Sequence, residues 1–445
     1  MRLFGTDGVR GLANGEILTA SLALDLAVSA ARTLLSHEDY HGRRPVAVVG
    51  RDTRVSGQFL EAAVMAGLAS AGVDVVQLGV IPTPGIAYLT DALGADLGVV
   101  ITASHNPMPD NGIKFLQRGG IKLDDSLEDE IESRLGEVWE RPTGAAVGRI
   151  RSHATAVEDY AEHLASTVEG SLSGLTVVLD CAQGAASVSA PLALTKLGAR
   201  VIPINNTPSG TDINEHCGAT HPELLQRKVV EHGADCGFAF DGDADRCIGV
   251  DGEGNIIDGD AIIALLAVGL SEEGRLPSDT VVVTVMSNLG FQHAMEAHHI
   301  KVRRTAVGDR YVAEEMRAGG FGLGGEQSGH LIMSEYATTG DGTLTAVQVL
   351  ARMKKTGDSL LDLAAVMDRL PQVLINVRDV PRSRATDADV SAAVAVEEAA
   401  LGSAGRVLLR PSGTEEMIRV MVEASTQRRA TEVAERLAAV VSAER

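Results

Sequence analysis

The segment LTVVLDCAQGAASVSAPLALTKLGARVIPI, residues 175–204, decides the fold class of this chain. The Val-rich run 175–180 predicts a buried strand, the Ala- and Leu-rich stretch 187–197 predicts a helix, and 200–204 predicts a second strand. Two strands joined by a helix form a βαβ unit, and such units build parallel sheets. This segment therefore predicts an α/β protein.

Strands and helices are expected to alternate in the same way on both sides of this segment. The other expected helices are 20–36, 57–71, 223–232, 260–270, 289–298 and one that starts at residue 309. The other expected strands are 46–49, 73–78, 97–101, 236–240, 280–285 and 301–305. From residue 373 the pattern changes. We expect a strand, a helix of Ala and Glu, two strands at 407–409 and 418–422, and a last helix ending at residue 445.

Clusters of Gly, Pro and Asp between these periodic segments mark the expected domain boundaries. We expect three related α/β domains with mixed, mostly parallel sheets at residues 1–149, 150–257 and 258–370. A smaller carboxyl-terminal α+β domain should follow at residues 371–445. The 445 residues suffice for this division, because a domain typically takes about 100–200 residues.

Composition excludes several classes of protein. The formal net charge of −21 disfavours binding to nucleic acid, whose phosphates need a basic surface. No apolar run approaches the ~18 residues of a membrane span, and no secretory signal follows Met1. The four cysteines include no Cys-x-x-Cys pair, which favours a reducing compartment. We therefore expect a cytoplasmic enzyme that binds neither nucleic acid nor membrane.

The most specific motif is Asp241-Gly-Asp-Ala-Asp-Arg246, directly after the expected strand 236–240. Its three carboxylates, Asp241, Asp243 and Asp245, are hard oxygen donors of the kind that Mg²⁺ prefers. A calcium-binding EF-hand loop is excluded, because its sixth position requires Gly and this motif has Arg there. The alternative is a hairpin turn, for which Asp-Gly is a common signal.

A second motif, Thr102-Ala-Ser-His-Asn-Pro107, follows the expected strand 97–101. Ser104 should lie on a loop at the carboxyl end of that strand, with its hydroxyl presented rather than buried. Such a serine can carry a phosphoryl group if a cation screens the charge and a base takes the proton. Equally open is a serine that only caps the next turn. A Ser-His-Asp hydrolase is disfavoured, since Ser104 lacks a Gly-x-Ser-x-Gly elbow.

Two further loops have the composition of ligand-binding sites. Arg410-Pro-Ser-Gly-Thr414, with Arg419 close behind, offers guanidinium groups and hydroxyls to a phosphate, although an ordinary turn remains possible. Gly324-Gly-Glu-Gln-Ser-Gly-His330 offers a carboxylate, a hydroxyl and an imidazole, as sugar recognition requires, although it could be a plain flexible loop. The opening Phe4-Gly-Thr-Asp-Gly-Val-Arg-Gly11 is not a dinucleotide-binding motif, because no strand is expected before it.

With these five segments, the whole chain resembles the α-D-phosphohexomutase superfamily and specifically the bacterial phosphoglucosamine mutases. FGTDGVRG, TASHNP, FDGDADR, GEQSGH and RPSGTEEMIRV occur in that family's order and spacing. The resemblance implies four domains around a central cleft, one Mg²⁺ per chain and, for many members, a homodimer. It also implies interconversion of glucosamine 6-phosphate and glucosamine 1-phosphate on the route to UDP-N-acetylglucosamine. That reaction uses a phosphoserine enzyme and a glucose- or glucosamine-1,6-bisphosphate intermediate.

The resemblance also implies roles for particular residues. The phosphate carrier is Ser104, which would share the metal with the three aspartates. The implied catalytic residues besides Ser104 are His105, Lys114, Arg10 and Arg246. The implied sugar-binding residues are Glu326, Ser328 and His330, and the implied phosphate-binding residues are Arg410, Ser412, Gly413, Thr414 and Arg419. One departure is Glu416, which stands where the family usually has Pro and adds a negative charge beside the phosphate loop.

Three alternatives to this function remain at the level of sequence. A phosphoglucomutase or phosphomannomutase would share the catalytic motifs and differ in the sugar loop, where Gln327 favours the glucosamine group. A catalytically silent sugar-phosphate sensor would keep the pocket without the transfer. A phosphatase would not need a second phosphate-binding loop.

Overall fold

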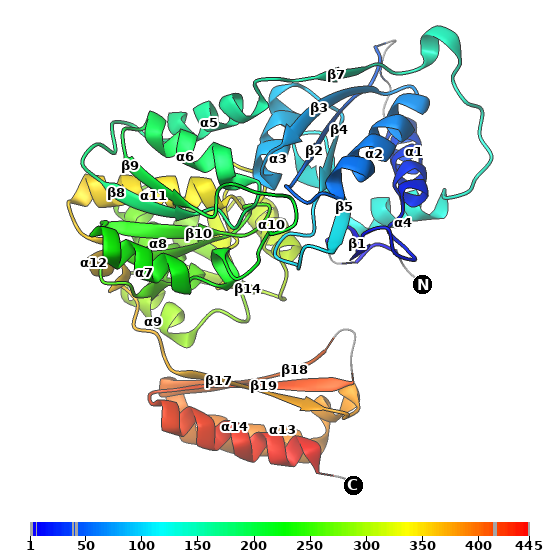
Figure 1. Cartoon of the computed structure of the whole chain (residues 1–445). Helices are drawn as coiled ribbons and strands as arrows, with labels where there is room; N and C mark the ends of the chain where they lie inside the picture. The colour runs from blue at the N-terminus through cyan, green and yellow to red at the C-terminus, as the bar shows by residue number, and fades with distance from the viewer. Residues whose placement is uncertain (1–2, 6, 38–39, 41–42, 413–415, 444–445) are drawn as a thin grey trace. The chain divides into compact units, whose positions relative to one another are not determined.

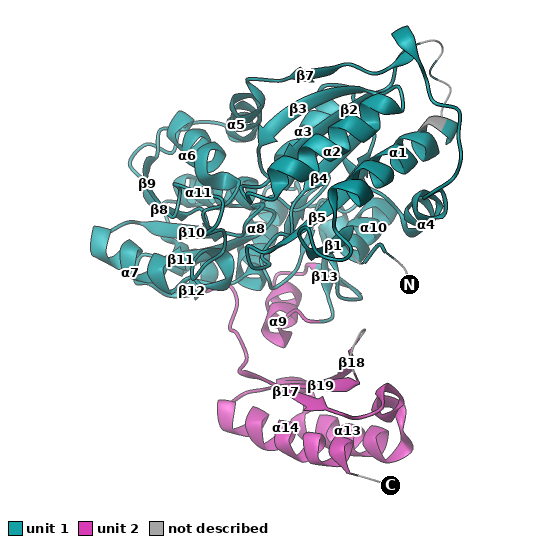
Figure 2. Cartoon of the chain, turned by 45° about the vertical axis from the view of Figure 1, so that its right-hand side comes forward, with its two compact units in different colours: residues 1–285, 301–364 teal, residues 286–300, 365–445 magenta. Residues whose placement is uncertain are grey.

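The structure of the chain, a computed structural model, describes residues 3–5, 7–37, 40, 43–412 and 416–443 (Figure 1). These residues form two compact units (Figure 2). Unit 1 comprises residues 1–285 and 301–364, and unit 2 comprises residues 286–300 and 365–445. Three of the four sheets belong to unit 1 and the fourth to unit 2.

The first sheet has the strand order β1-β5-β4-β2-β3-β7, with β6 paired to β5. Its centre is parallel, because β2 runs parallel to both β3 and β4. The strands are β1 (Val9–Leu12), β2 (Val46–Arg51), β3 (Asp74–Val80), β4 (Leu97–Ile101), β5 (Asp110–Gln117), β6 (Ile121–Lys122) and β7 (Ile150–Ser152). The helices of this part are α1 (Ala20–His37), α2 (Gly57–Ser70), α3 (Thr83–Ala92) and α4 (Asp125–Ser133), with a short 3-10 helix at Gly144–Ala146. Because β7 pairs with β3, the sheet continues past the boundary expected at residue 149.

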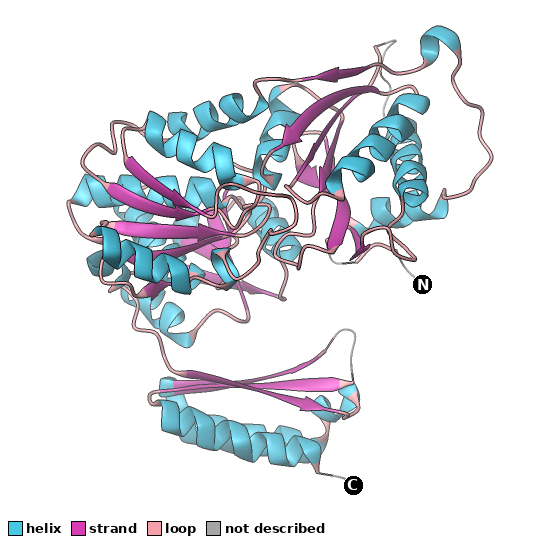
Figure 3. Ribbon diagram, in the orientation of Figure 1, coloured by secondary structure: helices cyan, strands magenta, loops and turns pink. Residues whose placement is uncertain are grey.

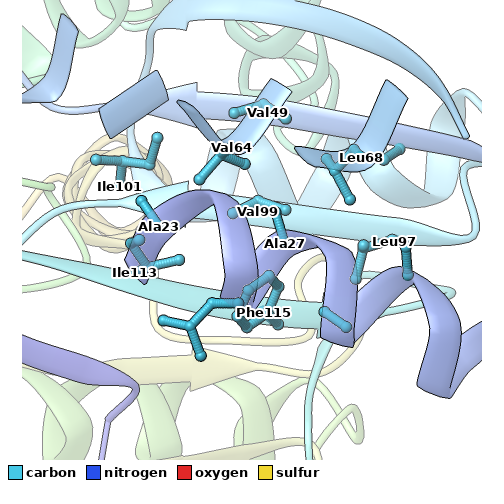
Figure 4. Close-up of a cluster of buried hydrophobic side chains, with 14 of the residues drawn as sticks. Ala23, Ala27, Val49, Val64, Leu68, Leu97, Val99, Ile101, Ile113 and Phe115 are labelled. Atoms are coloured by element: carbon cyan, nitrogen blue, oxygen red, sulfur yellow. The ribbon is translucent and has the colours of Figure 1, made fainter. Parts of the chain in front are cut away.

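Aliphatic side chains fill the core between this sheet and helices α1 and α2. Figure 4 shows Ala23 and Ala27 of α1 beside Val99 and Phe115 of the sheet, all of them buried. The two helices approach closely at Gly67, where an added Cβ would lie 2.5 Å from a backbone oxygen of α1. Burying each Val, Leu or Phe contributes about 1.5–3 kcal/mol, so this core fixes the edge of the sheet from which the functional loops extend.

The second sheet, of order β12-β11-β10-β8-β9, begins with the βαβ unit that decided the fold class. Strand β8 runs parallel to β9 and β10, whereas β10 and β11 are antiparallel. The strands are β8 (Thr176–Asp180), β9 (Arg200–Ile204), β10 (Cys236–Phe240), β11 (Cys247–Asp251) and β12 (Ile256–Ile257). The helices of this part are α5 (Ala156–Ser166), α6 (Ala186–Lys196) and α7 (Glu223–His232), with a 3-10 helix at Gly218–Thr220.

The third sheet has the order β14-β13-β15-β16. Here β13 is parallel to β14 and β15, and β16 is antiparallel to β15. The strands are β13 (Thr280–Thr284), β14 (Lys301–Thr305), β15 (Leu323–Gly325) and β16 (Leu331–Met333). The helices of unit 1 in this part of the sequence are α8 (Gly259–Glu272), α10 (Asp309–Gly319), α11 (Gly342–Thr356) and α12 (Leu360–Ala364), with a 3-10 helix at Pro277–Asp279.

The three sheets share one structural feature. In each, a parallel strand is followed by an antiparallel neighbour: β4 by β5, β10 by β11, and β15 by β16. The loops of these three pairs carry Ser104, the three aspartates and the Glu326–His330 segment, respectively. This repeated unit confirms the prediction of three related α/β parts and explains how each supplies one motif.

Unit 2 is built on an antiparallel sheet of order β17-β19-β18. Its strands are β17 (Gln372–Arg378), β18 (Gly405–Pro411) and β19 (Met417–Ala424). Its helices are α9 (Leu289–Ala297), α13 (Ala388–Leu401) and α14 (Gln427–Ser442), with 3-10 helices at Arg382–Thr386 and Gly402–Ala404. Helices α13 and α14 pack against this sheet and lie along one side of it (Figure 3). The last helix ends at Ser442, short of the predicted end at residue 445.

Within the described residues, none of the helices combines the length and the apolar character that crossing a membrane requires. The four cysteines are free and buried. The cytoplasmic location and the homodimer stay predictions.

Candidate active site

Ser104 and Asp241, 137 residues apart in sequence, meet in unit 1. Ser104 Oγ donates a hydrogen bond of 2.7 Å to Asp241 Oδ2. The prediction that the hydroxyl is presented rather than buried is wrong for this structure, since only 1% of Ser104 is exposed. The reason is that the loop between β10 and β11 packs directly on the serine. An added Cβ on Gly242 would lie 2.6 Å from the Ser104 carbonyl oxygen, so glycine permits this approach.

The three aspartates form a group that could hold a metal ion. One oxygen from each of Asp241, Asp243 and Asp245 lies within 4.8 Å of the others, and all three residues are buried. Asp243 Oδ1 and Asp245 Oδ1 are buried without a hydrogen-bond partner, which a bound cation would supply. Burial and then the charges of Asp245 and Asp243 raise the pKa of Asp241 well above its usual range. The three carboxylates therefore fit a hard divalent cation, which lets all of them ionise.

Lys114 connects this group to a carboxylate that the sequence analysis did not identify as functional, Asp7. The Lys114 Nζ lies 2.7 Å from Asp7 Oδ2 and 3.4 Å from Asp243 Oδ2. Although burial opposes it, the charges of Asp7 and Asp243 raise the pKa of Lys114 above its ordinary value. Lys114 therefore stays a cation at the edge of the aspartate group.

From Asp7 a chain of charged groups continues around the site. Lys122 Nζ lies 3.0 Å from Asp7 Oδ1 and pairs also with Asp309, the first residue of α10. His330 is next, with Nε2 3.6 Å from Asp309 Oδ2 and Nδ1 3.6 Å from Asp245 Oδ2. The chain joins segments near all three sheets of unit 1. Alternating charges of this kind fix one another's positions and offset the desolvation cost of burying ions.

Two arginines and one imidazole complete the surroundings of Ser104. His105 Nδ1 lies 3.2 Å from Ser104 Oγ. Burial and the cations Arg246 and Arg10 lower the pKa of His105 to about 4, so its ring is neutral near pH 7 and can accept a proton. Arg10, on β1, pairs with Asp7. The Arg246 amide donates to Asp241 Oδ1 at 3.2 Å.

The predicted sugar-binding residues lie on the loop from β15 to β16 but differ in their surroundings. Glu326 Oε1 accepts a hydrogen bond of 3.1 Å from the amide of Gly308, the residue before α10. Ser328 is exposed, whereas His330 is 2% exposed and therefore not the surface residue of the alternative interpretation. The Gly340 amide lies 3.1 Å from His330 Nε2, and His330 Nδ1 faces Asp245. His330 thus lies closer to the metal group than a purely sugar-binding role implies.

The predicted phosphate loop belongs to unit 2. Arg410 on β18 and Arg419 on β19 are direct cross-strand partners, so their side chains emerge on the same face of the sheet. Arg419 Nε is buried without a hydrogen-bond partner. Ser412 is buried, and its amide donates to the Met417 carbonyl at 2.8 Å. Gly413 and Thr414 lie outside the described residues.

Several residues near the site were missed from sequence: Asp7, Asp52, Arg54, Thr83, Lys122 and Asp309. Thr83 donates to Asp243 Oδ2 at 2.6 Å and helps fix that carboxylate. One signal was available for Asp52, because it directly follows a strand that ends at the same edge as the serine strand. Asp7 pairs with Lys122, and Lys122 with Asp309, across long stretches of sequence, and no local pattern reveals such pairs.

This arrangement defines a class of site. A hydroxyl held against three carboxylates, with a lysine and two arginines nearby, can carry a phosphoryl group while a divalent cation and fixed cations balance its charge.

Comparison with known proteins agrees with this class. Models of the phosphoglucomutase/phosphomannomutase family match in order along the chain: alpha/beta/alpha domain I at residues 1–141, domain II at 158–254, domain III at 258–370 and the C-terminal domain at 374–440. A phosphoglucosamine mutase from a Nocardioides species is 65% identical over 441 residues, covering 99% of this chain and 98% of the relative. The chain belongs to the phosphoglucosamine mutases, a family of isomerases.

Solved structures show the same fold. A phosphoglucomutase/phosphomannomutase family protein from Burkholderia thailandensis superposes with a TM-score of 0.84 at 23% identity, covering 100% of this chain and 98% of that one. An N-acetylphosphoglucosamine mutase from Aspergillus fumigatus, solved with GlcNAc-6P and magnesium, gives a TM-score of 0.64 at 20% identity. That alignment covers 92% of this chain and 84% of the fungal one.

Proposed function

We propose that this protein interconverts glucosamine 6-phosphate and glucosamine 1-phosphate through a phosphorylated Ser104. The observation that carries the proposal is the 2.7 Å hydrogen bond from Ser104 Oγ to Asp241, within a carboxylate group suited to a cation. An oxygen of a phosphate on that serine would lie within reach of the same cation. The class of substrate follows from the relatives, which are phosphoglucosamine mutases.

The reaction consists of two successive phosphoryl exchanges. In the first, the bond between phosphorus and Ser104 Oγ breaks and a new bond forms to the free hydroxyl of the sugar phosphate. A base takes the proton of the sugar hydroxyl, and an acid gives a proton to the released Ser104 Oγ, so the step consumes and produces no net proton. This produces a sugar 1,6-bisphosphate, whose other phosphate returns to Ser104 in the second exchange. Lys114 and His105 are the candidates for moving the proton, since both lie beside the serine and aspartate groups.

Asp241, Asp243 and Asp245 would hold one Mg²⁺, an ion that takes oxygen ligands and keeps positions free for a phosphate oxygen. When bound, Mg²⁺ supplies positive charge beside the phosphoryl group in transfer. Arg10 and Arg246 add fixed positive charge on the protein side, where it requires no reorganisation during the reaction. The charges thus compensate locally for the net charge of −21, which would otherwise repel an anionic substrate.

We propose that Glu326 and Ser328 bind sugar hydroxyls, with His330 at the side of the metal group. We also propose that the phosphate not being transferred binds to the loop of unit 2, through Arg410, Ser412, Gly413, Thr414 and Arg419. Paired guanidinium groups bind phosphate through forked, charge-assisted hydrogen bonds. A hydrolase would not need a second phosphate site, so the presence of this loop favours a mutase over a phosphatase.

A coupled assay tests this function. The purified protein with Mg²⁺ and a trace of sugar 1,6-bisphosphate should turn over glucosamine 1-phosphate faster than glucose 1-phosphate or mannose 1-phosphate. The Ser104→Ala variant should turn over none of them. A clear preference for glucose or mannose phosphate would make the protein a phosphoglucomutase or phosphomannomutase instead. Binding of the sugar phosphates without any turnover would identify a sensor.

A further inference from the structure

A buried arginine that the proposed reaction does not use gathers the backbone behind Ser104. The Arg54 side chain is fully buried. Its Nη2 donates to the carbonyl oxygens of Ser104 at 3.1 Å and Asn106 at 2.7 Å, and its Nη1 donates to that of Pro107 at 2.6 Å. One rigid guanidinium plane thereby fixes three carbonyls of the serine loop.

Arg54 is itself held from behind. Its Nε lies 2.9 Å from Asp52 Oδ2, and its amide donates to Asp52 Oδ1, also at 2.9 Å. The same Asp52 Oδ2 accepts from the Thr102 hydroxyl at 2.7 Å, and that hydroxyl accepts from the Ser104 amide at 2.9 Å. The amide and the carbonyl of Ser104 are therefore both tied to the Asp52–Arg54 pair.

A second donor reaches the same carbonyls from another part of the chain. Asn214 lies between β9 and α7, and its Nδ2 donates to the Ser104 oxygen at 2.8 Å and to the Asn106 oxygen at 3.1 Å. The backbone N–H of Asn214 donates a hydrogen bond of 2.9 Å to the carbonyl oxygen of Ala182, which lies just after β8. Asn214 thus fastens the serine loop to the part of unit 1 that carries the aspartates.

The serine needs such support because of its backbone conformation. Ser104 has a φ of 51°, in the left-handed region that residues other than glycine adopt at a cost. Released from its restraints, the loop would relax toward a more ordinary conformation and carry Oγ away from Asp241. Displacements of about 1 Å at a reacting group can lower a rate by about 10²-fold.

We propose that Arg54 and Asn214 are positioning residues for phosphoryl transfer: together they clamp the backbone of residues 104–107 so that Ser104 Oγ faces the aspartate group. This inference rests on the proposed function, because it concerns the transfer to and from Ser104. The clamp acts through backbone carbonyls and touches neither the phosphate nor the sugar, so its loss should lower the rate of transfer more than the affinity for substrate.

Asn214 gives the cleaner variant, and the chain offers a matched control. Asn205 also has a left-handed backbone, with φ 48° against 61° for Asn214, but its amide group bonds Asp180 rather than the serine loop. Replacing either asparagine by Ala removes an amide and strains a left-handed position to a similar degree. Only Asn214→Ala removes donors from the Ser104 and Asn106 carbonyls.

The experiment measures phosphorylation of Ser104 by glucose 1,6-bisphosphate in single-turnover mixtures with Mg²⁺, together with kcat and KM. We expect Asn214→Ala to lower the transfer rate and kcat by roughly tenfold with KM little changed, and Arg54→Lys by about 10²-fold. Asn205→Ala should match the wild type within roughly twofold.

Rates are expressed per folded molecule, from circular dichroism and thermal unfolding of each variant. If Asn214→Ala and Asn205→Ala transfer phosphate equally fast, the proposed positioning role is wrong. It is also wrong if Asn214→Ala is merely less stable and its folded molecules react at the wild-type rate. Should the wild type itself accept no phosphate on Ser104, the proposed function fails, which is a separate outcome.

Discussion

The serine centre of unit 1 and the phosphate loop of unit 2 both gather charged groups, but they do so in opposite ways. Around Ser104, opposite charges alternate, with Lys114 lying between Asp7 and Asp243. On the sheet of unit 2, two like charges, Arg410 and Arg419, are cross-strand partners. Like charges directly opposite each other are unfavourable in themselves. The first arrangement suits the alignment of reacting atoms, and for the second we propose binding of a phosphate.

The largest expected effect comes from the aspartate group. Replacing Asp243 by Asn removes a negative charge that a cation needs. It also takes from Lys114 one of its two carboxylate partners and from the Thr83 hydroxyl its ionised acceptor. We expect kcat to fall by about 10³-fold, close to 4 kcal/mol, with a much smaller change in KM. Steady-state kinetics over a range of Mg²⁺ concentrations provide the measurement.

Glu253→Gln is the control, because it neutralises an exposed carboxylate in the turn between β11 and β12. Its kinetics should match those of the wild type. An unchanged kcat in Asp243→Asn at saturating Mg²⁺ would refute the metal assignment.

A second contrast concerns how the carboxylates of the two units respond to pH. Asp341 in unit 1 is buried and caps α11, and burial raises its pKa to about 6. Because the folded pKa exceeds the usual 3.8, the favourable contribution of Asp341 is complete below about pH 4 and is lost as the pH rises through 6. Asp341→Asn does not titrate. The unfolding free energy of Asp341→Asn, taken relative to that of the wild type at the same pH, should rise by up to about 3 kcal/mol between pH 4 and 7.

Asp389 in unit 2 should behave in the opposite way. It is half exposed, and two hydrogen bonds of 2.7 Å from Arg384 lower its pKa to about 2. Its stabilising contribution is present above pH 4 and is lost as the pH falls toward 2. Denaturant titrations of Asp341→Asn, Asp389→Asn and the wild type at several pH values measure both trends. Differences from the wild type that do not vary with pH would contradict them.

The smallest expected effect lies in the phosphate loop. Arg419→Ala removes one of the two opposed guanidinium groups, and we expect kcat/KM to fall by roughly tenfold, mainly through a higher KM. Arg428→Ala, on the exposed side of α14, is the control and should have no effect. A loss in Arg419→Ala confined to kcat would show that this arginine assists the chemistry rather than docking the phosphate.

Much of the fold could be predicted because periodicity is a local signal. Strands β4, β9, β10 and β14 have the expected bounds, and most predicted helices agree within one or two residues. The antiparallel strands β5, β11 and β16 were missed. Each is short or contains polar residues such as Asn111 and Asp251, so its apolar pattern is weak. Each also pairs with the parallel strand that precedes it, and a local pattern does not show that pairing.

The residues of the candidate site likewise divide into those with a local sequence signal and those without one. Ser104 and the three aspartates stand in compact motifs directly after strands, so sequence could predict that each motif lies on a loop at the carboxyl end of its own strand. Asp7, Arg54 and Asn214 could not be found in this way, because each contacts a segment at least 50 residues away in the sequence. Long-range contacts of this kind leave no periodic trace.

The central claim is that Ser104 accepts and returns phosphate beside a cation held by the three aspartates. Its most direct test is the intact mass of the protein after incubation with glucosamine 1,6-bisphosphate, with and without Mg²⁺. We expect a gain of about 80 Da that requires Mg²⁺, maps to Ser104, is lost on adding glucosamine 6-phosphate and is absent in Ser104→Ala. A phosphate that still appears in Ser104→Ala, or that the wild type acquires equally well after chelation of all metal, would contradict it.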